Sequence, residues 1–371
     1  MTFKFFITPV YPYGNDHYYH EIICLAEGLK ELGYKVFSNH DYWWQPEKNE
    51  YLLNGDLSED YDVGIYDYRF VKSFEHLLMR PGYPNFPKGK KHILIDRNDW
   101  IAPFWLKEKY KIFHFIFAGN LFKSQKYPEN VHPWAIGLTT RIINNIDKVY
   151  KSEEKAYTIG YNFRVPHNMR KHVLENLQKL KQPYPIQPAF SSPVKIGEVQ
   201  LETQSEDQLY WQTTTKRHNP EYFKLLERHA FFLSFGGYME YKPILYQPYS
   251  ITDKIKRKPW FFYANYLKRC RKDLSNAMFV FQHDNFRFYE VLYSSSVPIN
   301  LDLESWDFLL PYMPRNGEHY LGIKKFNFND FEAELNALNT NKIRSIAEAG
   351  RNWVFEHYSP IAMAHYMLSK L

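Results

Sequence analysis

The start of the chain alternates between strand and helix patterns in a way that limits the possible folds. Phe3–Thr8 has the short apolar run of a buried strand, and His17–Leu32 carries its apolar residues at helical spacing. Gly33 ends this helix, and Tyr34–Ser38 is the next strand candidate. Strand, helix and strand in this order predict a βαβ unit, which builds parallel, doubly wound sheets.

The alternation continues along the chain and is repeated in its second half. The stretch Ile142–Glu154 is polar and charged without a strand pattern, so we place a junction between two domains there, and 371 residues suit about two domains. We expect a first domain at 1–150 and a second at 151–355. Further strands are predicted at Val63–Tyr66, His92–Asp96, Ile112–Phe117, Tyr157–Tyr161, Ala230–Ser234, Ala277–Phe281 and Val297–Asn300. Helices are predicted at Pro166–Leu180, Asn219–Arg228, Trp260–Lys272, Arg287–Ser295, Asn329–Leu338, Asn341–His357 and Pro360–Leu371.

Composition limits the class of protein further. Phe, Tyr and Trp make up 19% of the residues, which excludes a disordered chain. The net charge of +6 favours anionic partners but is small for a dedicated nucleic-acid binder, so no nucleic-acid partner is predicted. No stretch approaches the roughly 18 uninterrupted apolar residues of a membrane-spanning helix. Cys24 and Cys270 lie in separate predicted helices, which argues against a disulfide framework and indicates a reducing cytosol.

Several familiar catalytic motifs are missing from the sequence. Without GxxxxGK[ST], GxGxxG or GxSxG, a P-loop kinase, a standard Rossmann dehydrogenase and an α/β-hydrolase lose support. No CxxC or paired Cys/His spacing suggests zinc. Asp60 and Asp62 have DxD spacing, but they precede the strand Val63–Tyr66 instead of following it. We therefore predict no metal site.

The loop and helix start after Ala277–Phe281 hold the most informative polar residues. Asn285 and Phe286 open a predicted helix, whose first N–H groups can bind phosphate, and Arg287 adds a fork of donors. Glu290 shares the face of Arg287 and can accept two hydrogen bonds from a ribose diol. The alternative is a surface ion pair that follows a helix cap.

The segment Arg287–Ile299 resembles the donor site of GT-B glycosyltransferases, where a helix bearing Arg and Glu precedes a small residue and a Val/Ile-Pro-Val/Ile strand. Exostosin-like members and family-1-like bacterial sugar transferases look most similar. Ser296 replaces their usual Gly but is small enough for the same approach. The resemblance covers about Met278–Tyr366, including Trp306–Tyr312, His319–Leu321, Arg344, Gly350–Val354 and His357–Ser359.

The resemblance implies an α/β fold of two facing Rossmann-like domains, with a C-terminal helix at 356–371 that packs back on the N-terminal domain. It places Asn162, with Arg170 on the next helix, near the donor diphosphate. Gly236, at a predicted strand end, would allow close approach of a ligand, with Lys242 nearby. The alternatives are ordinary surface residues for Arg170 and a tight turn for Gly236.

The acceptor would bind in the first domain, where a base must remove the proton of its attacking hydroxyl. Asp16 or His17, in the first loop after a strand, is the predicted catalytic base, although Asp16 could also be a helix cap. Asp96 and Asp99 form a second cluster that could orient the acceptor or supply the base. His20 and the aromatic residues Tyr13 and Trp100 complete the predicted acceptor site.

The resemblance therefore implies a cytoplasmic glycosyltransferase. It would move a sugar from a nucleotide sugar to a hydroxyl of a glycan or lipid-linked acceptor in surface polysaccharide or glycoconjugate synthesis, with no cofactor and no metal. The alternatives are a non-catalytic carbohydrate- or membrane-binding protein and a phosphoalditol transferase. Eight basic residues between Lys254 and Lys272 leave open a peripheral contact with the inner face of the membrane, a nucleic-acid contact or a solvated helix face.

Overall fold

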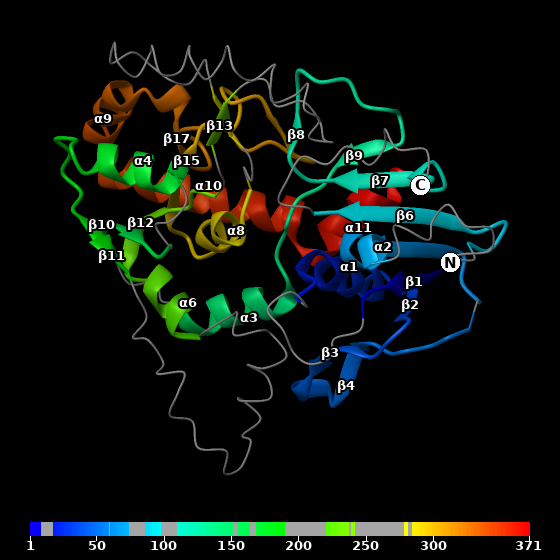
Figure 1. Ribbon diagram of the computed structural model, residues 1–371. Coiled ribbons are helices and arrows are strands. Elements are labelled where there is room, and N and C mark those ends of the chain that lie inside the picture. The colour runs from blue at the N-terminus through cyan, green and yellow to red at the C-terminus, as the bar shows by residue number, and fades with distance from the viewer. Residues whose placement is uncertain are drawn as a thin grey trace.

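The computed structural model describes residues 1–8, 18–58, 60–73, 86–97, 110–150, 155–163, 168–189, 220–236, 239–241, 278–280 and 284–371. Two parallel sheets organise this part of the chain (Figure 1). The first has the order β2-β1-β5-β6-β7-β9. Its strands are β1 (Thr2–Phe6), β2 (Lys35–Ser38), β5 (Val63–Asp67), β6 (Lys91–Asp96), β7 (Phe115–Ala118) and β9 (Val131–Pro133).

The second sheet follows with the order β11-β10-β12-β15-β17, and all its pairs are parallel. Its strands are β10 (Ala156–Tyr161), β11 (Ile186–Pro188), β12 (His229–Leu233), β15 (Val297–Leu301) and β17 (Leu321–Ile323). The central strands β12 and β15 are buried throughout, as expected for parallel strands covered on both faces. The predicted fold class of two Rossmann-like units is confirmed, while the boundaries at 150 and 355 stay predictions.

The helices lie in the order that a doubly wound fold requires. The described helices are α1 (His20–Glu31), α2 (Tyr68–Ser73), α3 (Thr140–Val149), α4 (Asn168–Leu177), α6 (Pro220–Leu226), α8 (Phe286–Tyr293), α9 (Phe328–Asn336), α10 (Thr340–Tyr358) and α11 (Pro360–Leu368), with 3-10 turns at Pro46–Lys48 and Lys324–Phe326. None of them is both long and apolar enough to cross a membrane. The helix predicted at Trp260–Lys272 lies outside the described residues.

Two local differences from the sequence-based expectation have clear causes. The polar stretch at the predicted junction contains most of α3, because Ile142 and Ile146 form a narrow buried apolar stripe beside the buried Arg141. The strand β14 (Met278–Val280) pairs antiparallel with β13 (Met239–Tyr241) instead of joining the parallel sheet. A short apolar run predicts a strand but does not specify its partner. The antiparallel hairpin of β3 (Tyr42–Gln45) and β4 (Glu50–Leu53) is a further addition.

The two units are joined at several places. After α10 leaves the second unit, α11 packs on α1 of the first, as the predicted C-terminal crossing requires (Figure 1). The contact is close, since a Cβ on Gly28 would lie 1.9 Å from the carbonyl oxygen of Pro360. The strands β8 (Leu121–Phe122) and β16 (Phe308–Leu309) pair antiparallel, one from each unit. These contacts hold the sheets in a fixed relation.

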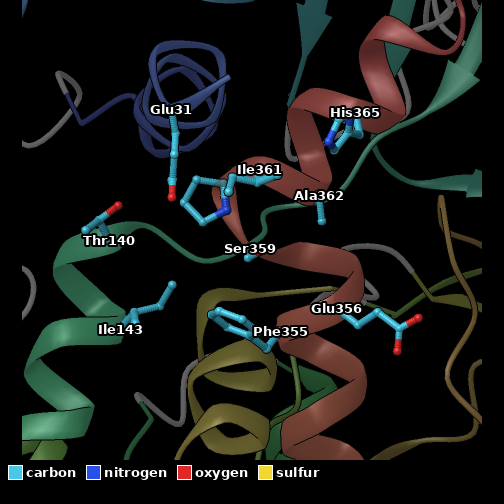
Figure 2. A pocket seen from close by; sticks show the side chains of 10 residues that line it. Glu31, Thr140, Ile143, Phe355, Glu356, Ser359, Ile361, Ala362 and His365 are labelled. Atoms are coloured by element: carbon cyan, nitrogen blue, oxygen red, sulfur yellow. The ribbon is translucent and has the colours of Figure 1, made fainter. Parts of the chain in front are cut away.

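A hollow of about 420 Å³ opens where α10 gives way to α11. Figure 2 shows Glu31, Thr140 and Phe355 reaching it from α1, α3 and α10. Its lining is mostly apolar, and Phe355 is 49% exposed. None of the predicted site residues that the structure describes lines this hollow, which lies at the crossing from α10 to α11.

Candidate functional site

The start of α8 meets the carboxyl ends of strands from both sheets, which is where doubly wound folds bind ligands. Arg97 follows directly after β6 of the first sheet. Its Nη1 donates to Oδ1 of Asp284, just before α8, across 2.9 Å. On the other side, Asn285 Nδ2 donates to the carbonyl of Ser234, directly after β12 of the second sheet, across 2.6 Å. The two units therefore converge on one helix terminus.

Arg97 is a buried cation held between carboxylates of the two units. Its Nε lies 3.3 Å from Oε1 of Glu21 in α1, opposite the bond to Asp284. The side chains of Arg97, Glu21 and Asp284 are 13%, 9% and 1% exposed. Burial disfavours the charged guanidinium, but the two carboxylates outweigh it and raise the pKa of Arg97. The guanidinium stays charged in the closed junction.

Asp284 is fully engaged by hydrogen bonds. Besides the bond from Arg97, its Oδ2 accepts from the backbone N–H of Ile136 at 3.0 Å and from the Tyr289 hydroxyl at 3.1 Å. Burial and the charge of Asp284 raise the pKa of Tyr289 well above its usual value, so Tyr289 remains a donor. Bonds from both units and from α8 itself thus fix this carboxylate.

The cap of α8 and one carboxylate of the helix make defined hydrogen bonds. Asn285 caps the helix by accepting from the N–H of Phe288 through Oδ1 at 3.3 Å. Glu290 is only 7% exposed, and its Oε2 accepts from the hydroxyl of Tyr222 at 3.0 Å. Burial and the nearby charge of Glu290 raise the pKa of Tyr222, while Arg287 opposes this rise. Glu290, Arg287 and Tyr222 therefore form one cluster, which is not an exposed surface ion pair.

Arg287 carries a buried donor that lacks an acceptor in the described part of the chain. Its Nε is shielded from solvent and has no hydrogen-bond partner there. Buried donors are nearly always paired, so an unpaired one at a helix terminus calls for an explanation. An anion bound beside the first turn of α8 would supply the missing acceptor.

The far end of α8 is held as firmly as its start. Lys155 Nζ donates to the carbonyl of Ser294, the C-cap of the helix, at 2.7 Å and to Ser296 Oγ at 2.8 Å. Burial lowers the pKa of Lys155 to about 8, although Glu227 opposes the shift. A cation at this end also complements the helix dipole.

The other predicted donor residues gather around the loop that follows β12. Arg170 Nε donates to the carbonyl of Phe235 at 3.2 Å, and the next residue, Gly236, is buried. Asn162 follows β10, which pairs with β12, so it lies at the same edge of the sheet. Lys242 lies outside the described residues.

The predicted acceptor residues are only partly described. His20 is fully buried, with Nδ1 2.7 Å from the Tyr18 hydroxyl, Nε2 3.0 Å from the Gly137 carbonyl and its ring 4.8 Å from that of Phe286. His20 is therefore part of the buried contact between the two units. Asp96 ends β6 next to Arg97 and is 5% exposed. The predicted residues Tyr13, Asp16, His17, Asp99 and Trp100 lie outside the described residues.

Two polar residues near the junction were missed by sequence reasoning. Asp67 ends β5, and Arg69 binds it through Nε at 3.0 Å and Nη2 at 3.2 Å. Burial raises the pKa of Asp67 despite the opposing charge of Arg69. The sequence does indicate Asp67, because this residue directly follows a predicted strand. Within the described ranges no group of three or more His, Cys, Asp or Glu could hold a metal ion.

Comparison with solved structures finds distant likenesses. The chain is similar to a glycosyltransferase of Rickettsia africae, with 11% identity, a TM-score of 0.48 and coverage of 99% of this chain and 97% of that one. HepE of Anabaena, solved with UDP-glucose, has 10% identity, a TM-score of 0.46 and coverage of 100% of both chains. TarM of S. aureus, solved with UDP, has 12% identity, a TM-score of 0.44 and coverage of 83% of this chain and 55% of that one.

No family model and no curated protein matches the chain. Likenesses at this level do not carry a function across.

Proposed function

We propose that the protein is a glycosyltransferase that moves a sugar from a nucleotide-sugar donor to a hydroxyl group of an acceptor. The observation that carries this proposal is the start of α8, where a buried Arg287 Nε without an acceptor in the described chain and a buried Glu290 lie in one cluster. This cluster stands where the carboxyl ends of both sheets converge. Such an edge is the usual place for a nucleotide in doubly wound folds.

The donor would bind along the carboxyl edge of the second sheet. The first N–H groups of α8 and the guanidinium of Arg287 suit a diphosphate, and the carboxylate of Glu290 suits the hydroxyl groups of a ribose. Arg170 and the Ser234–Gly236 loop lie beside this edge and are proposed to support the diphosphate, with Asn162. Phe286 and Lys242 complete the proposed donor site.

The proposed transfer is a displacement at the anomeric carbon of the donor sugar. A base in the first unit takes the proton of the acceptor hydroxyl as its oxygen attacks the anomeric carbon. The bond from that carbon to the diphosphate breaks, and the nucleoside diphosphate leaves with the electron pair. Arg287 and the α8 terminus would offset its charge, so we propose that no metal is required.

The base is proposed to be Asp16 or His17, with Asp96 and Asp99 as alternatives. The acceptor would be a glycan or lipid-linked saccharide bound beside Tyr13 and Trp100, with the buried His20 as a support of this site. A cytoplasmic site with contact to the inner face of a membrane would suit a lipid-linked acceptor. Alanine substitution of each candidate base, scored by turnover at saturating donor, identifies the base, because only its loss should lower kcat without weakening donor binding.

The proposal is tested by a panel of nucleotide sugars scored by release of the nucleoside diphosphate. Glu290→Gln should lower donor affinity by about tenfold or more, because an amide is a weaker acceptor for the ribose hydroxyls. Glu348→Gln, on the exposed face of α10, is the matched control and should leave the affinity unchanged. The proposal fails if no nucleotide sugar binds or turns over. Binding of CDP-alditols alone would favour phosphoalditol transfer.

A further inference from the structure

We propose that Arg97 is a positioning residue, contributed by the first unit, that fixes the start of α8 and screens Asp284 so that the donor diphosphate can bind there. The inference rests on the proposed function, because its ligand is the nucleotide-sugar donor. It goes beyond that function by assigning a role in donor binding to the unit that does not carry the donor site. Arg97 is not placed in contact with substrate.

The first step is mechanical. Asp284 directly precedes Asn285, the cap of α8, and Arg287 and Glu290 follow within the first turns of the same helix. Since a helix turn is stiff, any displacement of Asp284 is passed to Arg287 and Glu290. Asp284 is tied to the first unit by Arg97 Nη1 at 2.9 Å and by the Ile136 N–H at 3.0 Å. Arg97 thus helps to set the helix start relative to the first unit.

The second step is electrostatic. A carboxylate next to the start of α8 would repel the diphosphate that is proposed to bind there. Glu21 and Asp284 bring two negative charges to the junction, and Arg97 lies between them with contacts at 3.3 and 2.9 Å. Because these groups are at most 13% exposed, water screens them little. Without Arg97 the electrostatic potential at the start of α8 would become more negative and would disfavour an anionic ligand.

Loss of Arg97 should act locally. The units are also joined by the β8–β16 pair and by α11 on α1. Neither joint involves Arg97, so a variant that folds should keep the two units together. The loss should then appear at α8 and in donor binding, with the overall arrangement unchanged.

A matched control is available in the first unit. Arg69 also binds a buried carboxylate, Asp67, through two hydrogen bonds, and its side chain is 35% exposed. Its contacts with Asp67, Tyr18 and Tyr19 all lie within the first unit. Arg69→Met should therefore remove a carboxylate-bound arginine of the first unit without changing α8. A purely structural role for Arg97 predicts that the two variants behave alike.

The experiment measures hydrogen exchange in α8 and the Kd of the best nucleotide sugar from the panel. Arg97→Met should weaken protection of the Phe288 amide, which is bonded to Asn285, and raise the donor Kd by about tenfold or more with kcat nearly unchanged at saturation. Arg97→Lys should restore part of both, and Arg69→Met should change neither. If Arg97→Met fails to fold, Asp284→Asn should weaken protection of the Phe288 amide in the same way, because it weakens the contact with Arg97. Its donor Kd should rise less than that of Arg97→Met, because the carboxylate that Arg97 screens is then neutral.

Two further outcomes separate this inference from the proposed function. The Kd effects of Arg97→Met and Asp284→Asn should not add in the double variant, because both act through one contact. Unchanged α8 protection in Arg97→Met, additive effects, or an equal Kd rise in Arg69→Met would overturn the positioning role. If the wild type binds no nucleotide sugar, the proposed function fails and the donor-binding part of this inference falls with it, while the exchange data still decide whether Arg97 fixes α8.

Discussion

The guanidinium of Arg97 donates to the carboxylate of Asp284 across 2.9 Å, although the two residues are 187 positions apart in the chain. This contact joins the end of a strand in the first unit to the start of a helix in the second. Breaking a buried pair leaves an unpaired charge, which costs about 3–5 kcal/mol. The relation of the two units therefore depends on a few buried polar atoms as well as on apolar packing.

Gly119 leaves the space that Arg97 occupies. A Cβ at this position would lie 2.3 Å from Nη1 of Arg97 and 3.1 Å from its Cζ. Gly119→Ala should therefore displace the guanidinium and lower the free energy of unfolding by about 2 kcal/mol or more. The measurement is chemical denaturation of the single variant and of the same change in an Arg97→Ala background. There the cost should fall below about 0.5 kcal/mol, and equal costs in both backgrounds would show that Gly119 acts otherwise.

The buried Glu27 should make the stability of the protein depend on pH. Its Oε2 accepts from the Thr140 N–H at 2.7 Å, and burial raises its pKa to about 7. Between its unfolded value near 4.5 and about 7, the folded state keeps a proton that the unfolded state has lost, so stability falls as pH rises. Glu27→Gln should therefore gain about 2–3 kcal/mol over the wild type between pH 4.5 and 8.

The control for Glu27 lies on the same helix. Glu31, the last residue of α1, is exposed, so Glu31→Gln should shift stability by a nearly constant amount across this range. Unfolding curves at several pH values give both differences. If the stability difference between Glu27→Gln and the wild type did not change with pH, Glu27 would be ionised in the folded state over the whole range.

Tyr222 separates two roles of Glu290. Tyr222→Phe removes the hydroxyl that donates to Glu290 Oε2 and should cost about 1 kcal/mol of stability. If Glu290 binds the donor, the donor Kd of this variant should stay within about threefold of the wild type, while Glu290→Gln loses tenfold or more. Titration of both variants with the same nucleotide sugar makes the comparison. Equal losses would mean that Glu290 serves mainly to hold α6 to α8.

Gly28 tests the crossing of α11. A Cβ there would lie 1.9 Å from the Pro360 carbonyl oxygen and 2.9 Å from Cβ of Ala364, so α11 would have to move away. Gly28→Ala should lower stability by about 3 kcal/mol even though alanine is the better helix former. Glu31→Ala, at the exposed end of α1, is the control for an alanine that does not meet the backbone of α11, and it should change stability by less than about 0.5 kcal/mol. A stabilised Gly28→Ala variant would show that the two helices are not packed this closely.

The order of strands and helices could be predicted from sequence because it rests on local patterns. The described parts of Phe3–Ser38 and the segment Arg287–Asn300 became strands and helices with small shifts at their ends. Asn285 became the helix cap that the alternative interpretation of this loop included. The partner of β14 could not be predicted, because a three-residue strand has no periodicity that names its neighbour.

The polar junction was beyond sequence reasoning for a related reason. Glu21 lies in the first turn of α1, Arg97 directly follows β6, and Asp284 precedes the cap of α8. No local feature of the sequence indicates that these three side chains meet. Their pairing depends on how the two units face each other. Asp67 was different, since it stands at the end of a predicted strand and could have been included.

The packing of α11 on α1 also constrains how the protein can be made. Helix α1 ends at Glu31 and α11 begins at Pro360, so 360 − 31 = 329 positions separate them. At about 5–20 residues per second, a ribosome needs roughly 15–65 s to add them. During that time α11 is not yet available to pack on the face of α1 around Gly28. Part of the core of the first unit is therefore exposed to water or accessible to a chaperone. The first unit therefore cannot complete its folding as an early, independent step of synthesis.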